Sequence, residues 1–194
     1  MNFLAHIYLS GDDDEVIIGN FIADGIKGKR YLNYPPGISK GIVLHRAIDT
    51  FTDAHPTVHQ STARLHKNYG HYSGVIVDIL YDHFLAKNWS QYHPQPLAEY
   101  VEDFYTLLRA NFTSLPARIQ RMMPYMMADN WLLNYATVDG IAKILVQMNV
   151  RTKGVAKMDQ AVQELIQYYD EFEAEFTSFF KELITFCKQK LQEI

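Results

Sequence analysis

The sequence predicts a single all-α domain. Apolar residues recur mostly at helical spacing, and few segments alternate with the period of two that is typical of strands. Proline and glycine divide the chain into segments of helical length. A chain of 194 residues suits one domain with a substantial core, and it contains neither an internal repeat nor a low-complexity segment. We therefore expect one helical bundle that spans residues 1–194.

Four helices are predicted in the first half of the chain, over residues 16–22, 39–51, 56–69 and 75–86. The acidic run 12–15 precedes the first of them, and carboxylates favour a helix N-terminus. Ser39 is the expected N-cap of the second helix, and Pro56 suits the first turn of the third. Proline and glycine mark breaks at 34–37 and 70–74.

Four further helical segments are predicted in the second half, over residues 97–111, 116–127, 138–150 and 159–194. Pro124 is expected to interrupt the second of these, and Thr137 to cap the third. The last stretch has an apolar side along its whole length and is expected to form one long helix. This reading gives roughly seven to nine helices in all.

The composition narrows the function classes. A hydrophobic fraction of 48% argues against disorder, and a formal net charge of −4 gives a nucleic-acid partner no support from bulk charge. Cys187 is the only cysteine, so there is neither a disulfide framework nor a thiolate metal site, which is typical of a reducing compartment. No segment has the length of a membrane span and no signal peptide is evident. We therefore expect a cytoplasmic protein without a membrane partner.

The predicted helix 75–86 carries more ionisable groups than its apolar character explains. Asp78, Asp82 and His83 lie within six residues of one another. An unpaired buried charge destabilises a fold strongly, and a divalent metal is an economical way to compensate it. Adjacent residues project about 100° apart around a helix. We therefore expect Asp82 rather than His83 to reach a metal.

His45 and Asp49 form a second candidate cluster. They lie four residues apart, so a helix places them on one face. Mixed histidine and carboxylate ligation suits Mn²⁺, Fe²⁺, Zn²⁺ or Mg²⁺, and nitrogen ligands favour the first three. A surface pair is the alternative for either cluster alone. Two such clusters in one small domain favour metal binding.

Asp24, His6 and Arg46 are further candidates with open alternatives. Asp24 ends an apolar run and is otherwise an exposed helix-end carboxylate, while His6 is otherwise a hydrogen-bonded core histidine. Arg46 offers a planar fork to a phosphate oxygen, or pairs with a surface carboxylate. All eight histidines lie in residues 1–93. We therefore expect the site there, and mainly scaffold helices in residues 94–194.

Several blocks of the sequence resemble the bacterial acyl carrier protein phosphodiesterases. They keep the order and spacing of that family over about the first ninety residues, and Trp131-Leu132 is a weaker match. Together the blocks are specific, although each alone would be weak. The matching blocks are Met1–His6 (MNFLAH), Gly19–Asp24 (GNFIAD), Gly41-Ile42, Leu44–Asp49 (LHRAID), Thr52-Asp53, Asp78, Asp82–Leu85 (DHFL) and Trp89–Gln91 (WSQ).

The resemblance implies a bundle that is a distorted relative of the HD phosphohydrolases. It also implies dependence on Mn²⁺ and hydrolysis of the phosphodiester that joins 4′-phosphopantetheine to a serine of holo-acyl carrier protein. The HD enzymes carry a His-Asp dipeptide, whereas this chain has the reversed pair Asp82-His83. Ligands therefore cannot be assigned by copying them from the HD superfamily.

With that reaction as the hypothesis, each candidate residue has an expected role. Arg46 is expected to neutralise charge on the non-bridging oxygens, and His83 or His6 to protonate the leaving oxygen. Five residues are expected to bind the metal or to orient its ligands: Asp24, His45, Asp49, Asp78 and Asp82.

The protein substrate implied by the resemblance is acidic, and this chain is acidic too, so docking needs a local basic face. Lys27, Lys29 and Arg30 form the first candidate patch for binding the carrier protein, and Arg118 with Arg121 form the second. A solvated basic turn is the alternative reading of the first patch.

Two other functions stay open on the sequence. One is a phosphohydrolase of a small nucleotide such as guanosine tetraphosphate, which would need no docking face. The other is a helical protein that binds a partner without catalysis, which predicts no bound transition metal. A nucleotide substrate panel and elemental analysis separate these functions from the carrier protein phosphodiesterase.

Overall fold

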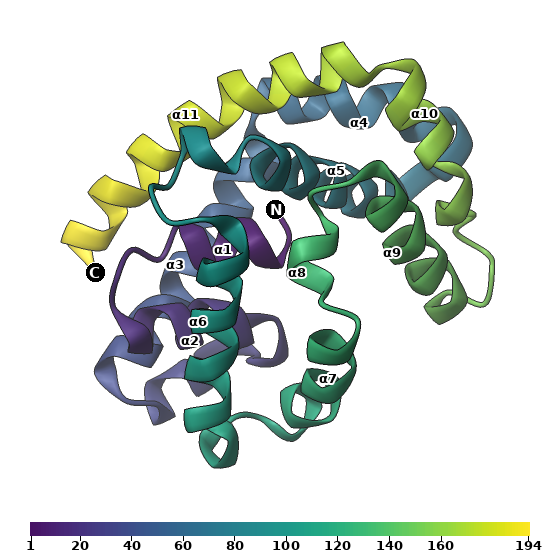
Figure 1. Cartoon of the computed structure of the whole chain (residues 1–194). Helices are drawn as coiled ribbons and strands as arrows, with labels where there is room; N and C mark the ends of the chain where they lie inside the picture. Colours follow the sequence, from purple (N-terminus) through teal and green to yellow (C-terminus); the bar gives the residue numbers. More distant parts are fainter.

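The computed structural model describes residues 1–194 as an all-α protein without strands, which confirms the predicted fold class (Figure 1). Its helices are α1 (Phe3–Tyr8), α2 (Asp14–Ile22), α3 (Pro36–Ala54), α4 (Pro56–Tyr69), α5 (Ser73–Lys87), α6 (Leu97–Ala110), α7 (Ala117–Ala128), α8 (Trp131–Asn134), α9 (Val138–Arg151), α10 (Val162–Gln167) and α11 (Tyr169–Glu193). The predicted number of helices is too low, because α1, α8 and α10 are too short to show a periodicity. No helix combines the length and the apolar character that a membrane span requires.

Of the three residues predicted to lie at helix starts, two are confirmed and one is wrong. The side chain of Thr137 caps α9, and Pro56 occupies the first position of α4. Ser39 is not the N-cap of α3, because that helix begins three residues earlier at Pro36, whose fixed φ suits a first turn. The Ser39 hydroxyl donates instead to the backbone oxygen of Tyr31.

Two predictions about where helices are interrupted also differ from the structure. Helix α7 continues through Pro124, since a proline removes a single backbone donor and the other turns of the helix keep theirs. The last stretch is not one helix. It contains the 3₁₀ turn η6 (Met158–Gln160), then α10 and α11, and the non-helical backbone of Tyr168 separates the last two.

Helix α5 lies near the centre of the molecule, and the long α11 crosses α3, α4 and α5 along one side (Figure 1). Phe172, Phe176, Phe179 and Phe180 of α11 are fully buried in this packing. Burial of apolar surface is worth roughly 25 cal/mol per Å², so these rings contribute strongly to the core. The central position of α5 explains why its sequence is apolar on nearly all sides.

Helices α2 and α3 pack on each other more extensively than any other pair, and two glycines permit their close approach. A Cβ on Gly19 would overlap the carbonyl oxygen of Ile38, and a Cβ on Gly41 would overlap the backbone of α2. The approach brings Asn20, which follows Gly19, within hydrogen-bond distance of His45. Helix α1 packs on α2, and its His6 stacks on His45 of α3, so three helices meet around these side chains.

Candidate functional site

Three side chains from two helices converge to form the candidate site. His6 of α1 and His45 and Asp49 of α3 offer ligand atoms that lie within 4.8 Å of one another. His45 Nε2 lies 3.2 Å from Asp49 Oδ2, and His6 Nε2 lies 3.4 Å from Asp49 Oδ1. The carboxylate of Asp49 therefore faces one nitrogen of each ring. The helical spacing of His45 and Asp49 has the predicted effect, since both project from one face of α3.

Asn20 orients both imidazoles. Its Oδ1 lies 2.8 Å from His6 Nδ1 and 3.0 Å from His45 Nδ1. Its Nδ2 donates to the backbone oxygen of His6 and to Ser10 Oγ, each at 2.9 Å, so a flipped amide would place oxygen against oxygen. Because an amide oxygen only accepts, both histidines donate from Nδ1. When neutral, each therefore presents an unprotonated Nε2 to Asp49.

The charged groups of the cluster shift one another's pKa values. Burial lowers the pKa of His45, but hydrogen bonds to Asp24 and Asp49 outweigh it and raise that pKa to about 9. Burial lowers the pKa of His6 to about 4. Burial raises the pKa of Asp49, yet the two imidazoles hold that pKa below its usual value. At neutral pH and without a metal, His45 is therefore protonated on both ring nitrogens and His6 is neutral. A metal ion that binds His45 must displace the proton on its Nε2.

Asp24 lies at the open side of the cluster. Its Oδ1 is 3.3 Å from His45 Nε2, and its side chain is 61% exposed, compared with 44% for Asp49. A cavity of about 400 Å³ opens beside these residues, which is within the range of about 300–1,000 Å³ that is usual for ligand sites. The cluster therefore lies at the mouth of a cavity of ligand size.

The second half of the chain supplies the opposite wall of this cavity. Two buried polar atoms of the lining have no hydrogen-bond partner, the Thr52 hydroxyl and the Trp131 indole nitrogen. Buried polar groups normally have a hydrogen-bond partner, so these two groups are available to form hydrogen bonds with a bound ligand. The residues of the opposite wall are Arg118, Trp131, Tyr135, Ile144, Gln147, Met148 and Arg151.

The structure does not bring Asp78 and Asp82 into the cluster. Asp82 is fully buried, and its oxygens accept backbone N–H groups at the start of α1, including that of Leu4 at 2.7 Å. Asp78 lines the cavity, but its Oδ1 pairs with the α-ammonium of Met1 at 2.8 Å. A ligand role does not fit this geometry, because both carboxylates are engaged in holding α1. Their contacts tie α5 to the start of α1, the helix that carries His6.

Arg46 and His83 also lie away from the cavity, so their expected roles at the phosphodiester do not fit the geometry. The Arg46 guanidinium donates to the backbone oxygen of Ile26 at 2.7 Å. His83 Nδ1 lies 2.7 Å from the backbone oxygen of Tyr135, and its Nε2 lies 2.7 Å from the hydroxyl of Tyr169. His83 and Asp82 lie on different sides of α5, as predicted. The side that carries His83 contacts α11.

The two basic patches differ in their relation to the cavity. Lys27, Lys29 and Arg30 lie in and just before the 3₁₀ turn η2 (Gly28–Asn33), and all are exposed. None of the three lines the cavity, whereas Arg118 does, with Arg121 one turn further along α7. Only the second patch therefore reaches the site.

Three residues at the site escaped the sequence reasoning. Asn20 lies in the matching block that ends at Asp24. Gly19, which precedes it in an apolar helix, is the one feature of the sequence that indicates close packing there. Trp131 is a weak match to the family, and its apolar neighbours favour core packing over a binding surface. Arg151 carried no signal, because its place on the cavity wall depends on how α9 packs.

The donor set fits a divalent transition metal. Two imidazole nitrogens with fixed lone pairs and one carboxylate converge, and Asp24 is near enough to add a fourth group. Nitrogen and oxygen ligands of this kind suit Mn²⁺, Fe²⁺ or Zn²⁺ better than Ca²⁺ or Mg²⁺. The predicted divalent metal thus fits the residues present, and its identity as Mn²⁺ stays a prediction.

Comparison with known proteins shows similarity to one family along nearly the whole chain. A family model described as acyl carrier protein phosphodiesterase matches residues 1–183. The chain is 32% identical to the acyl carrier protein phosphodiesterase of Pectobacterium atrosepticum, over 97% of this chain and 98% of that protein. It is 31% identical to that of Yersinia pestis, over 98% and 99%. No solved structure matches the chain, so the likeness to HD phosphohydrolases stays a prediction.

Proposed function

We propose, because this chain belongs to the acyl carrier protein phosphodiesterase family, that it removes 4′-phosphopantetheine from holo-acyl carrier protein by metal-dependent hydrolysis. The chain is thus an enzyme, a phosphoric diester hydrolase. Its products are apo-acyl carrier protein and 4′-phosphopantetheine. Mn²⁺ is the metal that we propose, and the cytoplasm is the expected location.

One observation supports the metal dependence: His6, His45 and Asp49 converge at the mouth of the cavity, and their ligand atoms lie within 4.8 Å of one another. These three residues would hold the metal, and the exposed Asp24 would complete the set. A bound divalent metal lowers the pKa of water and polarises the phosphodiester. By accepting from both Nδ1 atoms, Asn20 leaves Nε2 of each ring as the nitrogen that faces the metal, and binding there displaces the second proton of His45.

The opposite wall supplies groups that suit a phosphodiester and its arm. Arg118 and Arg151 bring positive charge to the cavity, and charge-assisted hydrogen bonds to phosphate oxygens are strong. The unpartnered Trp131 indole and Thr52 hydroxyl can donate to polar atoms of the arm. In the reaction the oxygen of water bonds to phosphorus and the bond from phosphorus to the serine oxygen breaks. One proton of that water ends on the serine hydroxyl.

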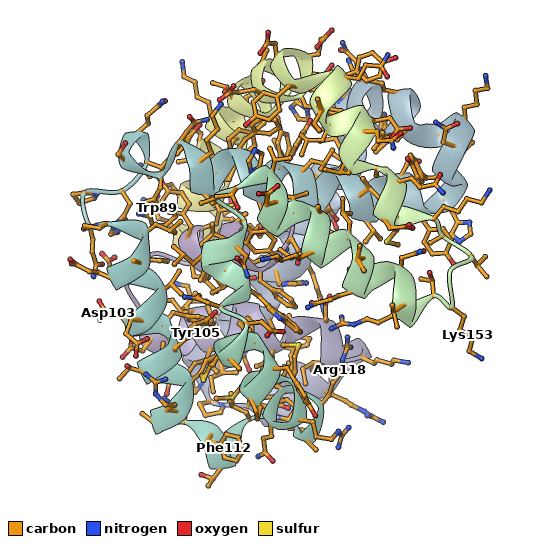
Figure 2. All side chains as sticks on the ribbon, turned by 45° about the vertical axis from the view of Figure 1, so that its right-hand side comes forward. Trp89, Asp103, Tyr105, Phe112, Arg118 and Lys153 are labelled. Carbon is orange, nitrogen blue, oxygen red and sulfur yellow. The ribbon has the colours of Figure 1, made fainter.

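Intact-mass measurement of the carrier protein tests this proposal. Holo-acyl carrier protein is incubated with the enzyme and Mn²⁺, with and without a chelator. We expect loss of the prosthetic group only when the metal is available, and no loss with an Asp49→Asn variant. Asp103→Asn is the matched control, because Asp103 lies on α6 outside the cavity (Figure 2).

Two results would overturn the proposal. The first is that the wild-type enzyme with Mn²⁺ leaves the holo-protein intact. The second is that metal-free enzyme in chelator cleaves the holo-protein as fast as the enzyme with Mn²⁺ does. Guanosine tetraphosphate in a parallel reaction tests the nucleotide alternative, and faster hydrolysis of that nucleotide would favour it.

A further inference from the structure

Cationic side chains are concentrated in one part of this acidic chain. Residues 117–158 contain six Lys or Arg and two Asp, whereas the rest of the chain contains twelve Lys or Arg and twenty Asp or Glu. The basic segment forms α7, α8 and α9, which contribute the second wall of the cavity. The protein therefore presents local positive charge beside its site despite a net charge of −4.

The outer surface of these helices is apolar as well as basic. A groove there is lined by Arg121 and Tyr125 of α7 and by Val146 and Val150 of α9, and we call these residues the α7–α9 face. Tyr125 is 68% exposed, Val146 49% and Val150 72%. Large apolar side chains gathered on an exposed surface and flanked by arginine are typical of protein interaction sites.

The α7–α9 face is continuous with the cavity. Arg118, Trp131, Gln147 and Arg151 line both the groove and the cavity. Figure 2 shows Arg118 on α7, on the side that faces α9. The Arg151 guanidinium lies 5.4 Å from the centroid of the Trp131 ring, so these two side chains occupy the boundary between the groove and the cavity. A partner on this face is therefore next to the site.

The geometry of the proposed reaction requires such a neighbouring surface. The bond to be cleaved joins a flexible arm to a serine on a folded protein, so a protein surface must come to the mouth of the cavity. Asp24 and Asp49 show that the cluster is open there, since both side chains are substantially exposed. The cavity behind the cluster then has room for the arm.

We propose, resting on the proposed function, that the α7–α9 face is the docking surface for the acidic carrier protein and that the cavity receives its prosthetic arm. Opposite charge steers the partner, and the exposed apolar side chains supply the contact area. This assignment replaces the sequence-based patch of Lys27, Lys29 and Arg30, which lines neither the cavity nor the groove.

Binding of fluorescently labelled apo-acyl carrier protein tests the proposal without turnover. We expect Arg121→Glu and Val150→Asp each to weaken binding by about tenfold. Arg121→Glu should also reduce the salt dependence of the Kd. The matched controls are Lys188→Glu on α11 and Ile166→Asp on α10, which make the same kinds of change on exposed positions away from the face. Both controls should bind as the wild type does.

A Lys29→Glu, Arg30→Glu double variant compares the two basic patches directly. The proposal is overturned if this double variant weakens binding more than Arg121→Glu does, or if Arg121→Glu and Val150→Asp bind normally. The KM for holo-acyl carrier protein gives a second readout, and it should rise in Arg121→Glu. Failure of the proposed function has a different signature, because the wild-type enzyme would then leave the prosthetic group in place.

Discussion

The imidazole rings of His6 and His45 stack with their centroids 4.0 Å apart and their planes 19° apart, although the two residues come from different helices. Both rings donate to the single oxygen Oδ1 of Asn20. Stacking and this shared acceptor fix the two Nε2 atoms side by side, facing Asp49. Groups that orient metal ligands in this way are as much a part of a site as the ligands themselves.

Asn20 should therefore control metal affinity without touching the metal. An Asn20→Ala variant removes the acceptor of both Nδ1–H groups, so each ring is free to rotate and to carry its proton on Nε2. We expect metal affinity to fall by about 10- to 100-fold, which is typical when such a partner of a metal ligand is lost. Competition with a chromogenic chelator measures it.

Ser10→Ala is the control for this variant. It removes one bond of the Asn20 amide nitrogen but leaves the contacts of Oδ1 with both rings. Metal affinity should stay close to that of the wild type. Normal metal affinity in a folded Asn20→Ala variant would refute the role of Asn20.

Metal binding should also stabilise the fold. A ligand that binds only the folded state at about 100 times its Kd stabilises it by about 2.7 kcal/mol, which raises the Tm of a protein of this size by roughly 5 to 10 °C. We expect this rise on adding Mn²⁺ to metal-free protein, and its loss in Asp49→Asn. Thermal denaturation monitored by circular dichroism measures it. An equal rise in the wild type and in Asp49→Asn would place the bound metal elsewhere.

The part of the site that lies on one helix was predictable from the sequence. His45 and Asp49 share a face of α3 because residues four apart always do so in a helix. The link from α3 to His6 and Asn20 was not predictable by spacing, since it depends on how α1 and α2 pack on α3. Helical periodicity determines which face a side chain occupies, and tertiary packing determines what that face meets.

Asp82 shows that a buried carboxylate in an apolar helix can have partners other than a metal. The sequence predicts that a carboxylate in an apolar helix has a compensating cation beside it. The structure places the α-ammonium of Met1 near this carboxylate and backbone N–H groups at the start of α1, which are orphan donors in any helix, against its oxygens. The carboxylate of Asp82 does have partners, but they lie at the start of α1, and the sequence does not predict that contact.

The close packing of α2 on α3 makes a stability prediction. An added Cβ at Gly41 would overlap backbone atoms of α2, which cannot move aside as a flexible side chain can. We expect Gly41→Ala to lower the free energy of unfolding by about 2 kcal/mol or more, as overpacking of a core does. Urea denaturation measures this loss.

Gly74→Ala is the matched control, because Gly74 lies in the first turn of α5 and an added Cβ there would meet no other atom within 4 Å. Alanine there should be neutral or stabilising by up to about 1 kcal/mol, since it favours the helix. A Gly41→Ala variant as stable as Gly74→Ala would mean that α2 and α3 do not depend on this contact.

The Asp82 carboxyl should make stability depend on pH with a definite sign. Burial raises the pKa of Asp82 to about 7 in the folded protein, against the α-ammonium of Met1 and the backbone N–H groups, which lower it. An aspartate in an unfolded chain has a pKa of about 3.9. Between about pH 4 and pH 7 the folded state therefore binds more protons than the unfolded state, so ionisation of Asp82 destabilises the fold as the pH rises.

An Asp82→Asn variant isolates this contribution, because the amide does not titrate while the other groups titrate in both proteins. We expect the Tm of the wild type minus that of the variant to be largest near pH 5 and to decrease towards pH 8. The measurement is thermal denaturation of both metal-free proteins across that range. A difference that increases with pH would show that Met1 and the N–H groups at the start of α1 outweigh burial. Asp82 would then hold α1, and with it His6, as a permanently ionised carboxylate.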